Sequence, residues 1–299
     1  MIWGQSAGAS SVDYHNYAYW DEPIAHAIFA ESGSAYPGTA WRDNSNFTFV
    51  ASNLGCSYPN NATQELQCMQ KVDYNKIINF MGQYQDNSTL RPSTPQPPLT
   101  FSAVADERLV FANYTQRYLE GFVSKVPMIY SSVANEGGSL QPYPIHNPYN
   151  GTNQSLANTI TEGVLCGASN STILRHSIGL PTFRYQYAGN WTNQDPLPWM
   201  GAFHSSDLVM LMGSYRTGEG PPVEALEGET SDTMGEYVLA FMRDPWNGPQ
   251  KLGWYPMDPS EADGGSMLRF GADGRAVQNV TGYEVQKVCF GEGSYDPFP

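Results

Sequence analysis

The sequence predicts an α/β fold from three observations: short apolar strands, the segments that follow them, and the length of the chain. Apolar runs of strand length occupy residues 25–30 and 126–133, and a run alternating with period two occupies residues 183–187. Polar, glycine-containing segments follow the first two runs, as functional groups do at the carboxyl edge of an open parallel sheet. The 299 residues can bury a sizeable core and lie within the range of one large α/β domain.

The first element in chain order is a strand that turns abruptly into a helix. Residues 2–3 are predicted to end the strand, and residues 9–19 to form the helix. Between them, GQSAG at residues 4–8 fits the G-x-S-x-G pattern of a nucleophile elbow. Such a turn crowds the backbone around the central serine, and glycines tolerate that crowding. Because strand and helix flank the pentapeptide, Ser6 is a candidate nucleophile.

A serine nucleophile of this kind needs an orienting acid and a base, which follow it along the chain in that order. Glu136 comes directly after the strand at residues 126–133, and His204 follows the strand at residues 183–187 through a loop. The other histidines lie on a predicted helix, at a strand start or in polar segments: His15, His26, His146 and His176. Any chain of this length offers some acid and some histidine in this order, so spacing alone leaves the assignment open.

The later segments complete the predicted fold. Residues 86–100 are predicted to be a stiff proline-rich loop within the domain, residues 231–243 an amphipathic helix, and residues 267–280 a hairpin. Asp207 is interpreted as a helix cap or a supporting group near the histidine. Four aromatic residues near the candidate site either line a pocket or pack in the core: Tyr143, Trp191, Trp199 and Phe203.

Composition and charge argue against two classes of partner. Charged residues are 15% of the chain, below the roughly 25% of typical soluble domains. The net charge is −14, so binding of nucleic acid or an anionic membrane surface through counterion release is disfavoured. No uninterrupted apolar stretch approaches 18 residues, so we expect no transmembrane segment.

The sequence is typical of a secreted glycoprotein. It contains nine N-x-[ST] sequons, about three times the number expected by chance. An even number of cysteines, four, also fits an oxidising compartment, although a loop composition rich in Asn and Thr would produce sequons as well. No signal peptide follows Met1, so we expect the N-terminal part to be missing. The sequons begin at Asn46, Asn61, Asn87, Asn113, Asn150, Asn153, Asn170, Asn190 and Asn279.

Several motifs together resemble the type-B carboxylesterases, the cholinesterase/lipase family, and in particular its secreted fungal members. The resemblance runs nearly from end to end and rests on the elbow with its following SVDY and on the segments AIFAESGS at residues 27–34, ANEGG at 134–138, GAFHSSD at 201–207 and AFMRDP at 240–245. It implies that residues 1–299 form a single α/β-hydrolase domain, N-terminally truncated and starting at the elbow.

The same resemblance implies the site. It identifies Ser6, Glu136 and His204 as a catalytic triad and the backbone N–H of Ala7 as an oxyanion-hole donor. Two features depart from the family pattern. The interval from Glu136 to His204 is shorter than usual, so part of a helical lid region is expected to be reduced, and Glu31 stands where Gln is common.

The four cysteines fit the same family. The resemblance implies one disulfide between Cys56 and Cys68 and a second between Cys166 and Cys289. The alternative for the second pair is two buried free thiols. The chain has no C-x-x-C or H-x-x-x-H spacing, so no metal site is expected, and the resemblance calls for no cofactor.

The expected activity is hydrolysis of a small-molecule or lipid carboxylic ester through an acyl-enzyme on Ser6. Two alternatives remain: a non-catalytic binding domain of the same fold, and an inert truncated esterase. The 299 residues by themselves are expected to be nearly inactive, because the second oxyanion donor should come from a glycine-rich loop upstream of the elbow.

Overall fold

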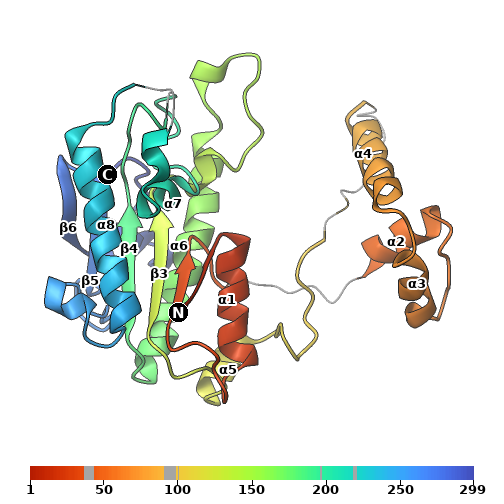
Figure 1. Cartoon of the computed structure of the whole chain (residues 1–299), viewed down its shortest axis with the longest axis horizontal. Helices are drawn as coiled ribbons and strands as arrows, with labels where there is room; N and C mark the ends of the chain where they lie inside the picture. The colour runs from red at the N-terminus through yellow and green to blue at the C-terminus, as the bar shows by residue number, and fades with distance from the viewer. Residues whose placement is uncertain (37–43, 91–98, 100, 196, 218–220) are drawn as a thin grey trace. The chain divides into compact units, whose positions relative to one another are not determined.

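The computed structural model describes residues 1–36, 44–90, 99, 101–195, 197–217 and 221–299 (Figure 1), with the side chains of residues 87–90 and 217 excepted. The chain divides into two compact units. The first comprises Met1–Thr39 and Ala112–Pro299, and the second comprises Ala40–Phe111. A single domain over the whole chain stays a prediction.

The first unit is built on a six-stranded sheet with the order β1-β2-β3-β4-β5-β6. The first five strands run parallel and β6 pairs with β5 antiparallel. The fold is therefore mixed α/β with a largely parallel sheet, as the sequence predicts. The strands are β1 (Ile2–Gln5), β2 (Ile28–Glu31), β3 (Met128–Val133), β4 (Thr182–Tyr187), β5 (Ser266–Ala272) and β6 (Arg275–Thr281).

Helices cover both faces of this sheet. On one face, α1 (Ala7–Ala18) and α6 (Gln154–Ser177) pack on the strands, and on the other α7 (Ser206–Leu211) and α8 (Ala225–Arg243) do so (Figure 1). The shorter helices are α5 (Tyr114–Leu119), α9 (Gly282–Gln286) and the 3₁₀ turns η1 (Glu136–Gly138), η2 (Pro148–Asn150), η3 (Ser214–Thr217), η4 (Pro249–Leu252) and η5 (Lys287–Phe290).

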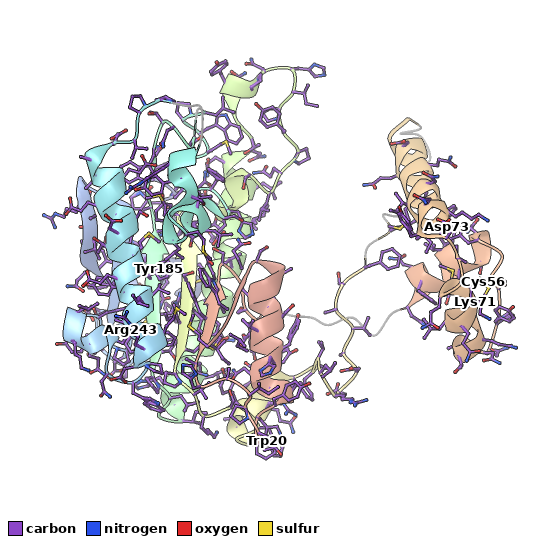
Figure 2. All side chains as sticks on the ribbon, viewed as in Figure 1. Trp20, Cys56, Lys71, Asp73, Tyr185 and Arg243 are labelled. Atoms are coloured by element: carbon purple, nitrogen blue, oxygen red, sulfur yellow. A yellow bond between two sulfur atoms is a disulfide. The ribbon has the colours of Figure 1, made fainter. Side chains whose placement is uncertain are left out.

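The central strands are buried on both faces, so successive side chains enter two different cores. The core against α1 and α6 takes Ile28, Ala30, Met128 and Tyr130. The core against α7 and α8 takes Phe29, Ile129, Val133, Phe183, Tyr185 and Tyr187. Figure 2 places Tyr185 in the interior of the first unit, where its ring contacts those of Phe29, Trp254 and Phe270. These two cores fix the sheet whose carboxyl edge carries the candidate site.

The second unit is helical. It contains α2 (Ser45–Asn53), α3 (Ala62–Met69) and α4 (Tyr74–Leu90). A disulfide joins Cys56 to Cys68, and Cys56 is labelled in Figure 2. The buried residues around it include Val50, Ala51 and Met69. A small apolar cluster and one covalent link therefore hold these helices together.

Some boundaries differ from those expected. The strand expected at residues 25–30 begins at Ile28 and extends to Glu31. The helix expected at residues 231–243 begins earlier, at Ala225, where Glu224 and Glu227 form a capping box. The loop expected at residues 86–100 is helical as far as Leu90, and residues 91–98 and 100 lie outside the described part.

A second disulfide joins Cys166, on α6, to Cys289, on η5. It excludes the alternative of two free thiols for this pair. Among the described residues, no helix combines the length and the apolar character needed to cross a bilayer.

Candidate active site

Ser6 lies at the turn between β1 and α1 and has an unusual backbone conformation. Its φ of 58° and ψ of −120° place a non-glycine residue at positive φ, a conformation that survives only where the surroundings enforce it. The N–H of Ser6 donates to the backbone oxygen of Glu31 at 2.8 Å, so β2 holds the turn. Ala7 is the first residue of α1, and its N–H has no acceptor within the helix. That N–H is therefore available to a ligand.

The glycines around this turn are not equivalent. A Cβ on Gly4 would lie 2.2 Å from the backbone oxygen of Gly8, and a Cβ on Gly33 would lie 2.6 Å from that of Ser6. A Cβ on Gly8 would meet nothing within 4 Å. The expectation that crowding requires both glycines of the pentapeptide is therefore wrong for Gly8. Gly33, from the loop after β2, takes the second crowded position.

Glu136 and His204 are in direct contact. Glu136 begins η1, with two residues intervening after the end of β3, and one of its carboxylate oxygens hydrogen-bonds with His204 Nδ1. Its other oxygen accepts the N–H of Val133 at 2.9 Å. The His204 side chain is 9% exposed and that of Glu136 is fully buried. Although burial lowers the pKa of His204, the hydrogen bond and charge of Glu136 raise it above its ordinary value.

Asn135 holds the loop that leads to His204. Its side-chain N–H groups donate to the backbone oxygens of Trp199 at 3.0 Å and Met200 at 2.8 Å. Its backbone N–H donates to Ala202 at 2.9 Å, and its side-chain oxygen accepts from Gln154 on α6 at 3.2 Å. One side chain next to the candidate acid thus fixes the segment that carries the candidate base.

Ser6 and His204 line one pocket of about 380 Å³, which opens above the carboxyl ends of β1 and β2. Hydroxyl groups and apolar side chains share its wall; the other lining residues are Ala7, Ser10, Tyr14, Ser32, Gly33, Ser34, Tyr36, Leu140, Ile160, Gly163 and Val164. Within the described residues no hydrogen bond joins Ser6 to His204, and Nε2 of His204 lies 3.3 Å from Nε2 of Gln5. The structure therefore places Ser6 and His204 around one pocket, and Glu136 contacts His204 from behind it.

For two sets of neighbouring residues, the structure argues against one of the two alternatives left open by the sequence. The four aromatics expected near the site are not among the described residues that line this pocket. Trp191 is buried and donates to the Tyr187 hydroxyl, and Trp199 donates to the backbone oxygen of Pro148. Asp207 is not the N-cap of α7, because Ser205 occupies that position. Asp207 is instead fully buried in the first turn of the helix.

The remaining histidines lie elsewhere in the fold. His176 is 41% exposed and pairs with Asp258 at 3.4 Å, and His146 is exposed in a loop. His15 stacks on Tyr19, and His26 precedes β2. None of these four is among the residues described around the pocket that contains Ser6.

Sequence reasoning missed three contributions to the site: the clamp by Asn135, the close approach of Gly33, and two further serines at positive φ. Ser32 follows β2 and Ser205 follows His204, with φ of 55° and 76°. The only sequence signal for these turns is a small residue directly after a strand or histidine, which is too common to single them out.

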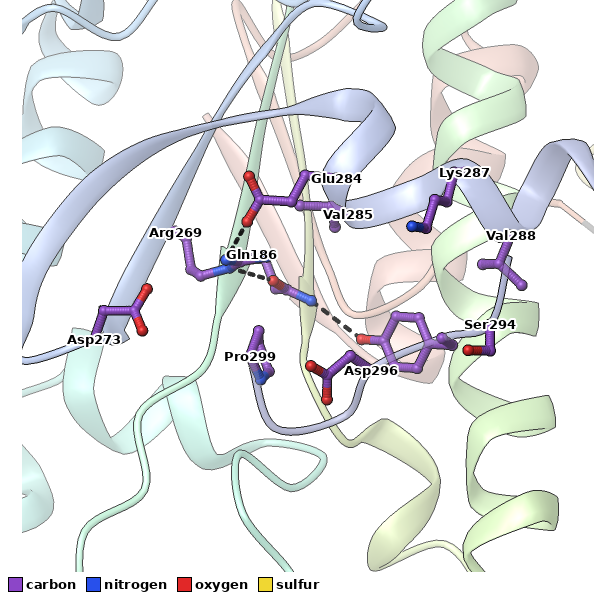
Figure 3. Close-up of a pocket in the computed structure, with 11 residues that line it drawn as sticks. Gln186, Arg269, Asp273, Glu284, Val285, Lys287, Val288, Ser294, Asp296 and Pro299 are labelled. Carbon is purple, nitrogen blue, oxygen red and sulfur yellow. Dashed lines mark hydrogen bonds and ion pairs between the residues drawn. The ribbon is translucent and has the colours of Figure 1, made fainter. Parts of the chain in front are cut away.

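A second pocket, of about 350 Å³, connects indirectly to the candidate acid (Figure 3). Arg269 on β5 donates to Gln186 at 2.8 Å and to Glu284 at 2.6 Å, as the dashed lines show. Gln186 donates in turn to the hydroxyl of Tyr295 at 3.1 Å, which donates to the backbone oxygen of Ala134 at 2.8 Å. This chain of hydrogen bonds ends at Ala134, two residues before Glu136, and restrains the segment between β3 and η1.

The described sequons lie away from the core. None of the eight whose side chains are described is buried. Three of them are also helix N-caps, since Asn61, Asn113 and Asn153 accept backbone N–H groups through their side-chain oxygens. This leaves the nitrogen, the atom that carries a glycan, free of the capping bond. Asn87 falls among the residues whose side chains are not described.

Comparison with known proteins places the fold and motifs in a family. Residues 1–162 match the sequence profile described as the carboxylesterase family. The chain belongs to the carboxylesterase family. Over 96% of its length it is 34% identical to a chlorogenic acid esterase of Aspergillus niger. Over 98% of its length it is 30% identical to secreted lipase 5 of Gibberella zeae.

The matched region is only part of each relative. The chain covers 56% of the Aspergillus esterase and 55% of the Gibberella lipase, so it spans about half the length of these curated relatives. Family membership therefore rests on about half of each relative and on nearly all of this chain.

Proposed function

We propose that this carboxylesterase-family protein has the α/β-hydrolase fold and hydrolyses carboxylic esters through Ser6, His204 and Glu136. Two observations made on His204 carry the proposal together. His204 pairs directly with the fully buried carboxylate of Glu136, and it lines the same pocket as Ser6, a serine at positive φ. This combination of nucleophile, base and orienting acid is the arrangement that activates a serine.

In the proposed reaction, Ser6 Oγ attacks the ester carbonyl while His204 Nε2 takes its proton. Glu136 holds the Nδ1 proton and stabilises the imidazolium, which then returns its proton to the leaving alcohol. A water molecule deacylates the enzyme with His204 again as the base, releasing the carboxylic acid and restoring the serine. His204 must first leave Gln5 and turn toward Ser6, a rotation that substrate binding would favour.

The negative charge that develops on the carbonyl oxygen needs donors fixed in advance. The N–H of Ala7, at the positive end of the helix dipole of α1, is the donor we assign from this chain. Removing one donor from such a site typically costs about 10²- to 10³-fold in kcat. The mixed hydroxyl and apolar wall of the pocket suits an ester with an apolar body and polar substituents.

We also propose that the protein acts outside the cell as a glycoprotein. Two disulfides and eight sequon asparagines that are not buried support this location, and one relative is named a secreted lipase. The protein released from a secreting host is expected to lose mass on enzymatic removal of N-glycans. An unchanged mass would contradict the proposal.

The test of the catalytic assignment is Ser6→Ala in the full-length protein. We expect it to abolish turnover of short-chain aryl esters and covalent labelling by an organophosphate. Ser10→Ala is the matched control, because Ser10 lines the same pocket but its hydroxyl already donates to the backbone oxygen of Ser34. Labelling that persists in Ser6→Ala, or that maps to another serine, would overturn the proposed nucleophile.

A further inference from the structure

Three buried carboxyl groups from different elements interact with one another, and two of them, Glu136 and Asp207, also act on His204. Glu31 ends β2, Glu136 begins η1 and Asp207 lies in the first turn of α7, and none has measurable exposure. The three act on one another electrostatically. Glu136 has a partner for each oxygen, namely the N–H of Val133 and the ring of His204. The other two carboxyls are not explained by the proposed reaction.

Each of these two carboxyls has one oxygen with a donor and one without. Glu31 Oε2 accepts from Trp3 Nε1 at 2.6 Å, and Asp207 Oδ2 accepts from the hydroxyl of Tyr185 at 3.2 Å. Glu31 Oε1 and Asp207 Oδ1 are buried and have no donor. The two side chains lie within hydrogen-bonding reach of each other. Two adjacent buried carboxylates would repel and would leave both oxygens unsatisfied.

We propose that Glu31 and Asp207 share one proton, and that this hydrogen bond makes Glu31 a positioning residue for His204. A proton on either carboxyl turns that group into a donor for the other and satisfies both orphan oxygens at once. Burial, followed by the charge of Asp207, raises the pKa of Glu31. Burial, followed by the charge of Glu136, raises that of Asp207. The surroundings therefore retain a proton at neutral pH.

The shared proton connects the two halves of the site. On one side, the backbone oxygen of Glu31 accepts the N–H of Ser6, and its side chain binds Trp3 on β1. On the other side, Asp207 lies three residues after His204. The bond thus ties the turn carrying the nucleophile to the start of the helix that follows the base. This inference rests on the proposed function, because Ser6 and His204 are its nucleophile and base.

The titratable groups that face the pair come from three elements. They are Glu136 on η1, Tyr185 and Tyr187 on β4, and His204 in the loop before α7. In the part of the chain that the structure describes, no group of three or more His, Cys, Asp or Glu side chains could hold a metal ion.

The decisive variant is Glu31→Gln, whose amide has the same shape and donates to Asp207 at every pH. Wild-type protein should show the infrared absorption of a protonated carboxyl at neutral pH, and Glu31→Gln should lack it. Folding that takes up a proton is weakened as pH rises above the ordinary pKa of a glutamate. Between pH 6 and 8 the unfolding constant of wild type should therefore rise about tenfold more per pH unit than that of Glu31→Gln.

Glu227→Gln is the matched control. Glu227 is equally buried, on α8, and accepts from Asn193 and Gln194, so the change should leave both the infrared band and the pH dependence as in wild type. A wild-type protein without the band, equal pH dependence in wild type and Glu31→Gln, or a Glu31→Gln that fails to fold would each overturn the shared proton.

The positioning role has its own readout, the rate at which an organophosphate labels Ser6. Glu31→Leu cannot donate and should slow labelling about tenfold by misplacing His204, whereas Glu31→Gln should label within about twofold of wild type. Equal rates in the two variants would overturn the role. If Glu31→Leu does not fold, the labelling rate of Glu31→Gln decides the positioning role. A tenfold slower rate than wild type would overturn the role, and an unchanged rate would support it. The infrared and unfolding measurements need no active nucleophile, so a failure of the proposed function would show separately, as labelling that survives Ser6→Ala.

Discussion

The turn that carries Ser6 and the pair formed by Glu136 and His204 are built in different ways. The turn is almost contained in five consecutive residues, with Gly33 added from the loop after β2. The acid and the histidine are 68 residues apart and meet only because β3 and β4 are adjacent in the sheet and Asn135 holds the histidine loop. A local motif therefore specifies the proposed nucleophile, whereas tertiary structure assembles the proposed base and its acid.

The largest effect should come from removing the assembled base. We expect His204→Gln to lower kcat for an aryl ester by about 10⁶-fold, as loss of the catalytic histidine does in a serine protease. His176→Gln is the control, because that histidine is 41% exposed and pairs with Asp258 away from the pocket. If His176→Gln proved as damaging as His204→Gln, the assembled half of the site would be wrongly assigned.

Changing the acid should cost less and should alter the pH dependence. Glu136→Gln is expected to lower kcat about 10⁴-fold, because the amide no longer fixes the imidazole tautomer. Glu136 raises the pKa of His204 against the effect of burial, and the base must be neutral to act. Activity of wild type should therefore fall as pH drops through a pKa above the ordinary histidine value.

In Glu136→Gln that acidic fall should move to lower pH, because burial remains while the raising charge is gone. The measurement is the pH profile of kcat/KM in both proteins. The His204 charge should also contribute stability below the ordinary histidine pKa, and this contribution should be lost as pH rises through the raised value. If kcat/KM fell at the same acidic pH in both proteins, Glu136 would not control the pKa of His204.

The comparison also shows how much of this molecule the sequence predicts. The elbow, the position of Glu136 after a strand and the largely parallel sheet follow from strand patterns and motif spacing. The choice of His204 among the five histidines follows from the family resemblance, because spacing alone leaves it open. The clamp by Asn135 and the crowding at Gly33 do not, because each depends on which loops meet in space. The pairing of Glu31 with Asp207 is likewise invisible along the chain, since the two residues are far apart in sequence.

Alanine substitutions at the glycines test whether the turn that carries Ser6 depends only on residues 4–8. Gly4→Ala should lower activity by about 10²-fold or more, because its Cβ would lie 2.2 Å from the Gly8 oxygen and would displace Ser6. Gly33→Ala should have a similar effect, since its Cβ would meet the backbone oxygen of Ser6 at 2.6 Å. Gly8→Ala is the internal control and should keep most activity, because a Cβ there meets nothing within 4 Å. Equal losses at Gly4 and Gly8 would show that the motif, rather than the measured contacts, sets the requirement.

The smallest effect should come from loosening the loop that carries His204 while leaving Glu136 and His204 themselves unchanged. Asn135→Ala removes the donors to the backbone oxygens of Trp199 and Met200 but keeps the backbone bond to Ala202. We expect about a tenfold fall in kcat, with KM little changed, and a loss of about 1 kcal/mol in the free energy of unfolding, because two partly buried acceptors lose their partners. Asn135→Asp keeps the shape but sets a carboxylate against two carbonyl oxygens, so it should cost more than Asn135→Ala. Asn193→Ala, which removes a side-chain bond to Glu227, is the control and should leave kcat unchanged. If Asn135→Ala matched that control, the histidine loop would be held by its backbone contacts alone.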